Sequence, residues 1–163
     1  MANDVTNVVI AGLGGQGIIR ASDILADAAF YAGFDVKKSE IHGMSQRGGS
    51  VSSDVRFGKK VWSPMIPMGE ADFLVLCDRS QREVFWPYLK ESGVLISVED
   101  IPSDKLPHSK TLNIALLGIL STYLPISFEA WERAISLRLG GKLFEANRQA
   151  FDIGRSLVSQ PTR

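Results

Sequence analysis

The glycine-rich segment AGLGGQG, residues 11–17, constrains the fold more than any other part of the chain. The apolar run NVVIAG leads into it and is typical of a buried parallel strand, because the run is almost continuously hydrophobic. Residues 15–33 follow with helical periodicity, placing Arg20, Asp23 and Asp27 on one face, and they end at Gly33, a typical helix C-cap. A strand that passes through glycines into an amphipathic helix predicts an α/β fold.

The next segments predict a second strand and a hairpin. Residues 35–41 (DVKKSEI) form a strand candidate directly after the helix, which favours a strand–helix–strand unit. Between residues 41 and 51 there is too little room for a crossover helix. Residues 50–58 (SVSSDVRFG) alternate in polarity, and we expect them to turn at Gly58 into a short strand through KKVWSP.

The second half of the chain predicts two further strands and several helices. ADFLVLCD and GVLISV are the strand candidates, and Pro87 limits the regularity of the short helix predicted between them. Three helices follow, over 111–124, 128–139 (capped by Ser127) and 142–157. We therefore expect a single domain, residues 1–163, with a Rossmann-like three-layer α/β fold: a mostly parallel sheet, a β-hairpin insertion and C-terminal helices.

Composition excludes several classes of function. Lys and Arg number 18 and Asp and Glu number 18, a balance that argues against bulk nucleic-acid binding. The single cysteine, Cys77, excludes an internal disulfide and any multi-thiolate metal site held by this chain alone, and its apolar surroundings indicate a core residue. The sequence shows neither a signal peptide nor an apolar run of membrane-spanning length, so we expect a cytoplasmic protein.

The glycine-rich turn allows more than one interpretation. Gly12, Gly14 and Gly17 fit the pattern G-x-G-x-x-G, which permits a phosphate to approach the amino end of a helix. A nicotinamide dinucleotide site also needs an acidic residue near the end of the second strand, where Glu40 lies, but the expected second crossover helix is missing. Close packing of helix on sheet is a third explanation of the glycines.

The segment SEIHGMSQRGGSV, residues 39–51, is the second candidate site. It combines three glycines with Arg47, whose planar charge suits a phosphate or carboxylate, and with His42, which can transfer protons near neutral pH. An ordinary solvated loop is the alternative explanation. Asn113 and Asn147 lie within otherwise periodic helices, where each has an amide able to bond a loop carbonyl.

Residues 12–58, GLGGQGIIRASDILADAAFYAGFDVKKSEIHGMSQRGGSVSSDVRFG, closely resemble the gamma-type subunit or domain of the 2-oxoacid:ferredoxin oxidoreductases. HGMSQRGGSV is most similar to the beta subunit of the indolepyruvate enzymes. The resemblance continues through VWSPMIPMGEADFLVLCD, LNIALLGILSTYLPIS and EANRQAF, and so covers nearly the whole chain.

The resemblance implies a subunit of a thiamine-diphosphate-dependent complex that decarboxylates a 2-oxoacid, such as indolepyruvate or another aryl pyruvate, to an acyl-CoA with electrons passed to ferredoxin. It implies that thiamine diphosphate, magnesium and iron–sulfur clusters lie on partner subunits, that the isolated chain is inactive, and that CoA is a candidate ligand of this chain. The implied partners include neither nucleic acid nor a membrane. The cofactor-binding positions it implies are Gly12, Gly14, Gly15, Gln16 and Gly17 in the first block, and Ser45, Gln46, Arg47, Gly48 and Gly49 in the second.

One segment departs from the family pattern. Relatives usually carry an additional strand–helix–strand passage where this chain has only the short connection between Val98 and Leu112. Two other functions therefore stay open: a stand-alone regulatory module that binds CoA or a nucleotide, and a purely structural subunit. The interpretation of this chain as a subunit of a 2-oxoacid oxidoreductase complex requires that the two glycine blocks, Gly12–Gly17 and Gly43–Gly49, lie together at one edge of the sheet.

Overall fold

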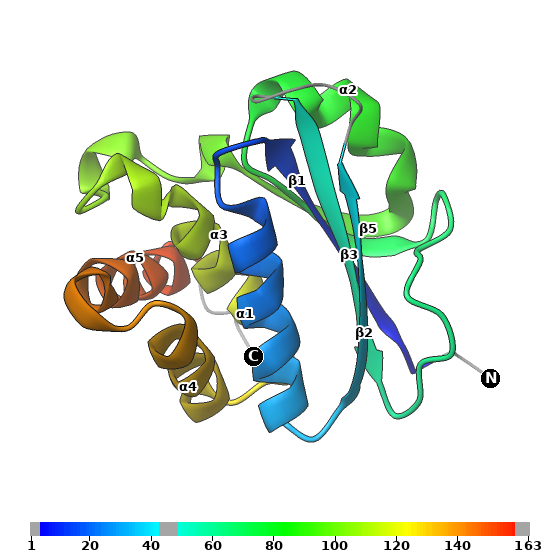
Figure 1. Ribbon diagram of the computed structural model, residues 1–163. Helices are drawn as coiled ribbons and strands as arrows, with labels where there is room; N and C mark the ends of the chain where they lie inside the picture. The colour runs from blue at the N-terminus through cyan, green and yellow to red at the C-terminus, as the bar shows by residue number, and fades with distance from the viewer. Residues whose placement is uncertain (1–3, 43–48, 159–163) are drawn as a thin grey trace.

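A computed structural model describes residues 4–42 and 49–158 of the protein, which form one mixed β-sheet flanked by helices (Figure 1). The sheet has five strands in the order β2-β3-β1-β4-β5. The strands are β1 (Thr6–Leu13), β2 (Asp35–His42), β3 (Ser50–Gly58), β4 (Ala71–Leu76) and β5 (Leu89–Ser97).

The direction of the strands follows from their pairing. β1 runs parallel to β4, with Val8 opposite Phe73 and Ala11 opposite Leu76, and β4 runs parallel to β5. β3 is antiparallel to both β1 and β2. Among the described strands β3 alone is reversed, so the α/β fold is confirmed with a sheet that contains two parallel and two antiparallel ladders.

The predicted hairpin exists, but at a different place. β2 and β3 form it, with His42 opposite Val51, and residues 43–49 connect them. The expected hairpin at Gly58 is wrong, because β3 ends there and the structure assigns no strand to residues 59–70. β3 already pairs with β1 on one side and β2 on the other, so no backbone edge is left for a third partner. For the same reason β1 and β2 are not neighbours, although α1 connects them.

Four helices cover one face of the sheet (Figure 1). They are α1 (Ile18–Tyr31), α3 (Leu112–Ser121), α4 (Phe128–Arg138) and α5 (Phe144–Ser156). Ser127 caps α4 as expected, since its side chain accepts a hydrogen bond from the N–H of Ala130 at 3.2 Å. Gly33 follows α1 with φ +95°, a conformation that glycine adopts without steric cost.

The opposite face has a thinner cover. It carries α2 (Arg82–Phe85), the 3₁₀ turns η1 (Arg79–Gln81) and η2 (Trp86–Tyr88), and the segment 59–70. Ile66 from this segment and Phe85 from α2 pack on Leu74 and Leu76 of β4. The predicted helix after β4 is only four residues long, and Pro87 lies just beyond it.

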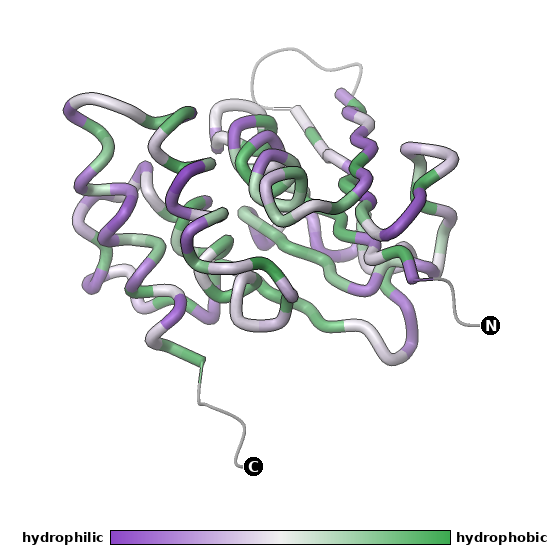
Figure 2. The backbone as a smooth tube through the Cα atoms, turned by 90° about the horizontal axis from the view of Figure 1, so that it is seen from below, coloured by the Kyte–Doolittle hydropathy of each residue, from purple (hydrophilic) through white to green (hydrophobic). Residues whose placement is uncertain are grey.

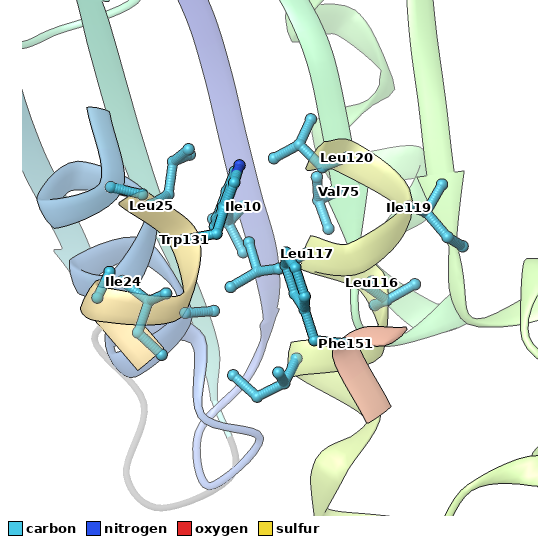
Figure 3. Packing of buried hydrophobic residues seen from close by; sticks show 14 of the residues in the cluster. Ile10, Ile24, Leu25, Val75, Leu116, Leu117, Ile119, Leu120, Trp131 and Phe151 are labelled. Carbon is cyan, nitrogen blue, oxygen red and sulfur yellow. The ribbon is translucent and has the colours of Figure 1, made fainter. Parts of the chain in front are cut away.

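The larger core lies between the sheet and the four helices, where Trp131 and Phe151 pack among Ile10, Leu117 and Val75 (Figure 3). The rings of Trp131 and Phe151 are 5.4 Å apart between centroids. α3 is buried over nearly its whole length, so its apolar side chains are used inside the domain. Burial of this kind is the main stabilising contribution in a protein of this size.

The connection from β5 to α3, residues 98–111, contains three 3₁₀ turns: η3 (Val98–Asp100), η4 (Ser103–Lys105) and η5 (Ser109–Thr111). A sixth, η6 (Gly141–Leu143), precedes α5. Hydrophobic residues follow the central strands, and hydrophilic residues gather on the outer turns of the helices (Figure 2). Within the described ranges, we find no helix with the length and hydrophobicity needed to cross a membrane.

Candidate functional site

The candidate site lies at the carboxyl ends of β1 and β4, where α1 begins. β1 ends at Leu13, and the chain turns through Gly15 and Gly17, whose φ angles are +93° and +74°. Gly17 is the N-cap of α1. The carboxyl edge of parallel strands is where ligands bind in open α/β sheets, because helix N-termini converge there.

Gln16 holds the turn in shape. Its Oε1 accepts the N–H of Leu13 at 2.7 Å, and its Nε2 donates to the carboxylate of Asp78 at 2.8 Å. A Cβ at Gly12 would lie 2.6 Å from Gln16 Oε1 and 2.7 Å from Ile18 Cδ1, so a larger residue there would displace these side chains. Hydrogen bonds from Ser80 and from Gln16 lower the pKa of Asp78, which keeps this carboxylate charged. The amide of Gln16 is therefore committed to the turn.

The second glycine block meets the first at this edge. The N–H of Gly14 donates to the carbonyl of Gly49 at 2.8 Å, a close backbone contact that glycines on both sides permit. The predicted meeting of the two blocks is confirmed for Gly49. The other predicted residues of the second block, Ser45, Gln46, Arg47 and Gly48, lie outside the described residues, as does Gly43.

Asn113 joins α3 to the glycine-rich turn. Its Nδ2 donates to the carbonyl of Gly17 at 3.0 Å, across 96 positions of sequence. Asn147 in α5 donates from Nδ2 to the carbonyl of Leu143 at 2.8 Å. Both asparagines bond a backbone carbonyl, an outcome that the sequence left open, and both are more than nine-tenths buried.

A cavity of about 590 Å³ opens beside the turn. Gly15, Gln16 and Gly17 form one wall, and Cys77 lies at the end of β4. Ile114 of α3, Leu139 at the end of α4 and Leu143 of η6 contribute apolar side chains. Arg20, His108 and Lys110 also line the cavity, and no Asp or Glu among the described residues does. It is therefore an apolar pocket whose lining includes basic side chains, which suits a ligand with an apolar body and anionic groups.

The sequence did not identify His108 and Lys110 as candidate residues. They lie in a connection that has no helical or strand periodicity, so no local pattern indicates where their side chains go. The only signal is their position just before the apolar helix α3. That signal becomes informative once α3 is known to start beside the glycine-rich turn.

Two helices begin at this cavity. α1 starts at Ile18 and α3 at Leu112, and the first residues of both line the cavity or its rim. The first N–H groups of a helix have no acceptor within the helix, and the helix dipole adds positive potential there. Two such helix ends, together with Arg20 and Lys110, make this edge attractive to phosphate groups.

A second cavity, of about 650 Å³, lies on the other side of the start of α1. Ile18, Ile19, Asp23, His42, Val51 and Arg138 contribute to its walls. Arg138 donates from Nε to Asp27 at 2.6 Å, so its charge is partly neutralised within the protein. This cavity separates α1 from the end of the β2–β3 hairpin, and Arg20 is common to both cavities.

The residues present do not fit an iron–sulfur cluster or a dinucleotide. Burial raises the pKa of the Cys77 thiol to about 12, and one neutral thiol cannot replace the several thiolates that a cluster needs. Within residues 4–42 and 49–158, His, Cys, Asp and Glu form no group of three able to hold a metal. Glu40 pairs with Lys38, and β3 separates its strand from β1, so Glu40 lies too far from the glycine-rich turn to hold a ribose bound there.

Comparison with known proteins identifies the family. Residues 7–157 match the pyruvate ferredoxin/flavodoxin oxidoreductase family. The chain belongs to this family. It is 32% identical to the indolepyruvate oxidoreductase subunit IorB of Pyrococcus horikoshii, over 91% of this chain and 93% of that protein. It is 29% identical to the gamma subunit common to the pyruvate and ketoisovalerate oxidoreductases of Pyrococcus abyssi, over 85% of this chain and 89% of that protein.

Solved structures show the same fold. The gamma subunit of a keto/oxoacid ferredoxin oxidoreductase from Geobacter sulfurreducens superposes with a TM-score of 0.79 at 27% identity, covering 93% of this chain and 97% of that one. The 2-oxoglutarate:ferredoxin oxidoreductase of Magnetococcus marinus gives a TM-score of 0.82 at 20% identity. There the similarity covers 96% of this chain but 31% of the other, so the fold forms one part of a longer polypeptide.

The chain is shorter than its relatives. The alignment with the Pyrococcus horikoshii subunit has 188 positions, while 91% of 163 residues is about 148, so about 40 positions have no counterpart in this chain. The structure connects β5 to α3 by 3₁₀ turns alone, and the sheet ends at β5. A shortened passage in this region, as expected from the sequence, is compatible with both observations.

Proposed function

We propose that this chain is the gamma-type subunit of a 2-oxoacid:ferredoxin oxidoreductase complex, with residues 1–163 acting as one domain. The observation that carries the proposal is the sequence match to an indolepyruvate oxidoreductase subunit over 91% of this chain and 93% of that protein. The fold shared with a gamma subunit from Geobacter sulfurreducens supports it. The reaction is the oxidative decarboxylation of a 2-oxoacid to an acyl-CoA, with electrons passed to ferredoxin.

Indolepyruvate or another aryl pyruvate is the proposed substrate. Support comes from the sequence identity, which is 32% to the indolepyruvate subunit and 29% or less to the pyruvate, ketoisovalerate and 2-oxoglutarate subunits over comparable shares of the chain. The partner subunits hold thiamine diphosphate, magnesium and the iron–sulfur clusters in this proposal. The cysteine content of this chain agrees with that assignment of the iron–sulfur clusters, because Cys77 is buried and the chain has no second thiol.

The contribution of this chain is a binding site for CoA beside the reactive centre of its partner. Gly12, Gly14, Gly15, Gln16 and Gly17 shape the turn, and the first N–H groups of α1 are directed toward the phosphates. Gly49 sets the distance between this turn and the hairpin. A 2-oxoglutarate:ferredoxin oxidoreductase with CoA and succinyl-CoA bound has the same fold in one part of its chain, which supports CoA as the ligand.

The second block contributes polar groups to the same site in this proposal. We assign Ser45, Gln46, Arg47 and Gly48 to this role from the resemblance, with Arg47 stabilising an anionic group of CoA, of the substrate or of the partner subunit. Replacing Arg47 with Ala lowers turnover of the assembled complex in this account. Unchanged assembly and unchanged turnover of the Arg47→Ala complex contradict the assignment.

The decisive experiment is purification of the chain from its own organism under conditions that preserve complexes. We expect it to copurify with a large thiamine-diphosphate-containing subunit, and the complex to reduce ferredoxin with CoA and one of indolepyruvate, phenylpyruvate, pyruvate or 2-oxoglutarate. A chain that purifies without such a partner, or a complex that oxidises none of the four acids, overturns the proposal.

A stand-alone CoA-binding or nucleotide-binding regulator is the second candidate. One observation favours it: the cavity beside the glycine-rich turn combines apolar residues with Arg20 and Lys110, which suits an anionic ligand. Calorimetric titration of the isolated chain with CoA, together with the copurification experiment, separates the two functions. Binding of CoA without any thiamine-containing partner supports the regulator.

A further inference from the structure

We propose that His108 and Lys110, in the connection before α3, recognise a phosphomonoester, and that they select CoA over its 3′-dephospho form. The proposal rests on the proposed binding of CoA and adds the residues that decide which phosphate pattern the cavity accepts. Neither residue belongs to the two glycine blocks.

The first step is the distribution of charge around the cavity of about 590 Å³. Arg20 from α1 and His108 and Lys110 from the connection line it, and no Asp or Glu among the described residues does. Several other basic side chains form ion pairs: Lys38 pairs with Asp23, Lys90 with Asp72 and Arg138 with Asp27. Among the described residues no carboxylate lies within ion-pair distance of Arg20 or Lys110, so their charge is available to an anion.

The second step is the orientation of His108. Its Nδ1 accepts the N–H of Lys110 at 3.1 Å and so caps η5. A neutral imidazole that accepts at Nδ1 carries its proton on Nε2, which is left as a donor. The cap therefore fixes both the tautomer of His108 and the backbone that carries Lys110, and both residues line the cavity.

The third step is the number of anionic groups that the site accommodates. The N-terminus of α1 and the glycine-rich turn suit one phosphate group or a pyrophosphate, since the N–H groups there are few. His108 and Lys110 belong to a separate segment that enters the cavity with α3. CoA carries a pyrophosphate and, separately, a 3′-phosphomonoester with close to two charges near neutral pH. In the proposal the glycine-rich turn and the start of α1 bind the pyrophosphate, and His108 and Lys110 bind the phosphomonoester.

The fourth step concerns the rest of the ligand. Asn147 lines the cavity and is 94% buried, and the one hydrogen bond that the structure assigns to its side chain is made by Nδ2. Its Oδ1 accepts no hydrogen bond from the described residues, so it is available to a donor on the ligand. Beside it, Leu139, Leu143 and Ala146 offer an apolar surface to a flat ring. A purine with an exocyclic amine satisfies both features.

The test is calorimetric titration of the full chain and of the assembled complex with CoA and with 3′-dephospho-CoA. We expect Lys110→Gln to weaken the binding of CoA about tenfold or more and to leave the binding of 3′-dephospho-CoA unchanged, because a charge-assisted hydrogen bond to the phosphomonoester is lost. His108→Asn keeps an oxygen acceptor for the cap. We expect it to lower the affinity for CoA but not the affinity for 3′-dephospho-CoA. Lys105→Gln, in the same connection but away from the cavity, is the matched control and changes neither affinity.

Two results overturn the proposal while leaving the proposed function intact. One is a complex that assembles and turns over with CoA while Lys110→Gln has unchanged affinity for CoA. The other is an equal loss of affinity for CoA and 3′-dephospho-CoA in that variant, which assigns Lys110 to a group the two ligands share. Conversely, a chain with Lys110-dependent selectivity for CoA but no thiamine-containing partner supports the site and overturns the proposed function. Adenosine 3′,5′-bisphosphate and AMP, used as fragments with and without the 3′-phosphate, must show the same selectivity.

Discussion

At the scale of single residues, the site depends on atoms that bond to the backbone rather than to a ligand. Gln16 and Asn113 both use their amides to fix the glycine-rich turn, one from within it and one from α3. The sequence showed that Asn113 has an amide able to bond a loop carbonyl, and it placed Gly17 in the pattern G-x-G-x-x-G. It could not indicate that these two residues meet, because they are 96 positions apart.

Gly17→Ala tests how tightly this turn is held. Gly17 has φ +74°, and a Cβ added there would overlap the amide of Asn113. We expect a loss of about 2–4 kcal/mol in the free energy of unfolding, because left-handed backbone strain and overpacking both contribute. Gly15→Ala is the control: its φ is +93° but nothing lies within 4 Å of the added Cβ, so it should lose only about 1–2 kcal/mol. Urea denaturation measures both variants. Equal losses of unfolding free energy in Gly17→Ala and Gly15→Ala would mean that the contact with Asn113 does not constrain the turn.

Asp54 gives the chain a pH-dependent contribution to its stability. Its carboxylate is buried in β3, where Oδ2 accepts the N–H of Ile66 at 2.9 Å and so anchors the segment 59–70. Burial raises the pKa of Asp54 above its usual 3.8, against the opposing effects of the Ile66 hydrogen bond and of Arg56. The folded state therefore binds the proton more tightly than the unfolded state, and this contribution to stability falls as the pH rises from 3.8 through the folded-state pKa.

Asp54→Asn removes the charge and keeps an oxygen acceptor for Ile66. Relative to the natural protein, the variant should gain stability progressively as the pH rises through this range, and the difference should be smallest below pH 3.8. Chemical denaturation at several pH values between 3 and 7 measures the difference. Asp104→Asn, at an exposed position, is the control and should show no such trend. A difference that narrows as the pH rises means that the pKa of Asp54 is lowered rather than raised.

At the scale of elements, local patterns identified the strands and the long helices, because hydrophobic periodicity and the caps Gly33 and Ser127 are local signals. They placed the hairpin wrongly. Residues 50–58 alternate as a strand does, but which neighbour a strand pairs with depends on the whole sheet, and β3 is enclosed by β1 and β2. The 3₁₀ connection before α3 has no periodicity at all, so the cationic residues it brings to the cavity could not be found from sequence.

α3 and α5 cross with their backbones close together at Gly118 and Gly154. A Cβ at Gly154 would overlap the carbonyl of Ala115, and one at Gly118 would overlap that of Phe151. Gly154→Ala should destabilise the protein by about 1–3 kcal/mol, although alanine favours a helix by about 1 kcal/mol over glycine, because overpacking outweighs propensity. Asp152→Ala, exposed on the same helix, should not destabilise it. Thermal unfolding of both variants makes the comparison, and a stabilised Gly154→Ala variant is incompatible with the observed packing.

At the scale of the whole molecule, the topology brings distant segments to one edge. β1 and β4 end there, α1 and α3 begin there, and the hairpin meets the turn through Gly14 and Gly49. β3 lies between β1 and β2, which separates Glu40 from the glycine-rich turn and makes the arrangement unlike a dinucleotide site. Membership of the pyruvate ferredoxin/flavodoxin oxidoreductase family then gives this edge its proposed task, which is to bind CoA beside a partner subunit.

Hydrogen–deuterium exchange of the assembled complex, with and without CoA, tests that task most directly. Amide hydrogens exchange more slowly where a ligand or partner covers or orders the backbone. We expect CoA to slow exchange in residues 13–20 and 108–114, at the starts of α1 and α3, and to leave residues 59–70 on the opposite face of the sheet unchanged. Slower exchange in residues 59–70 alone, with none at the two helix starts, contradicts the account.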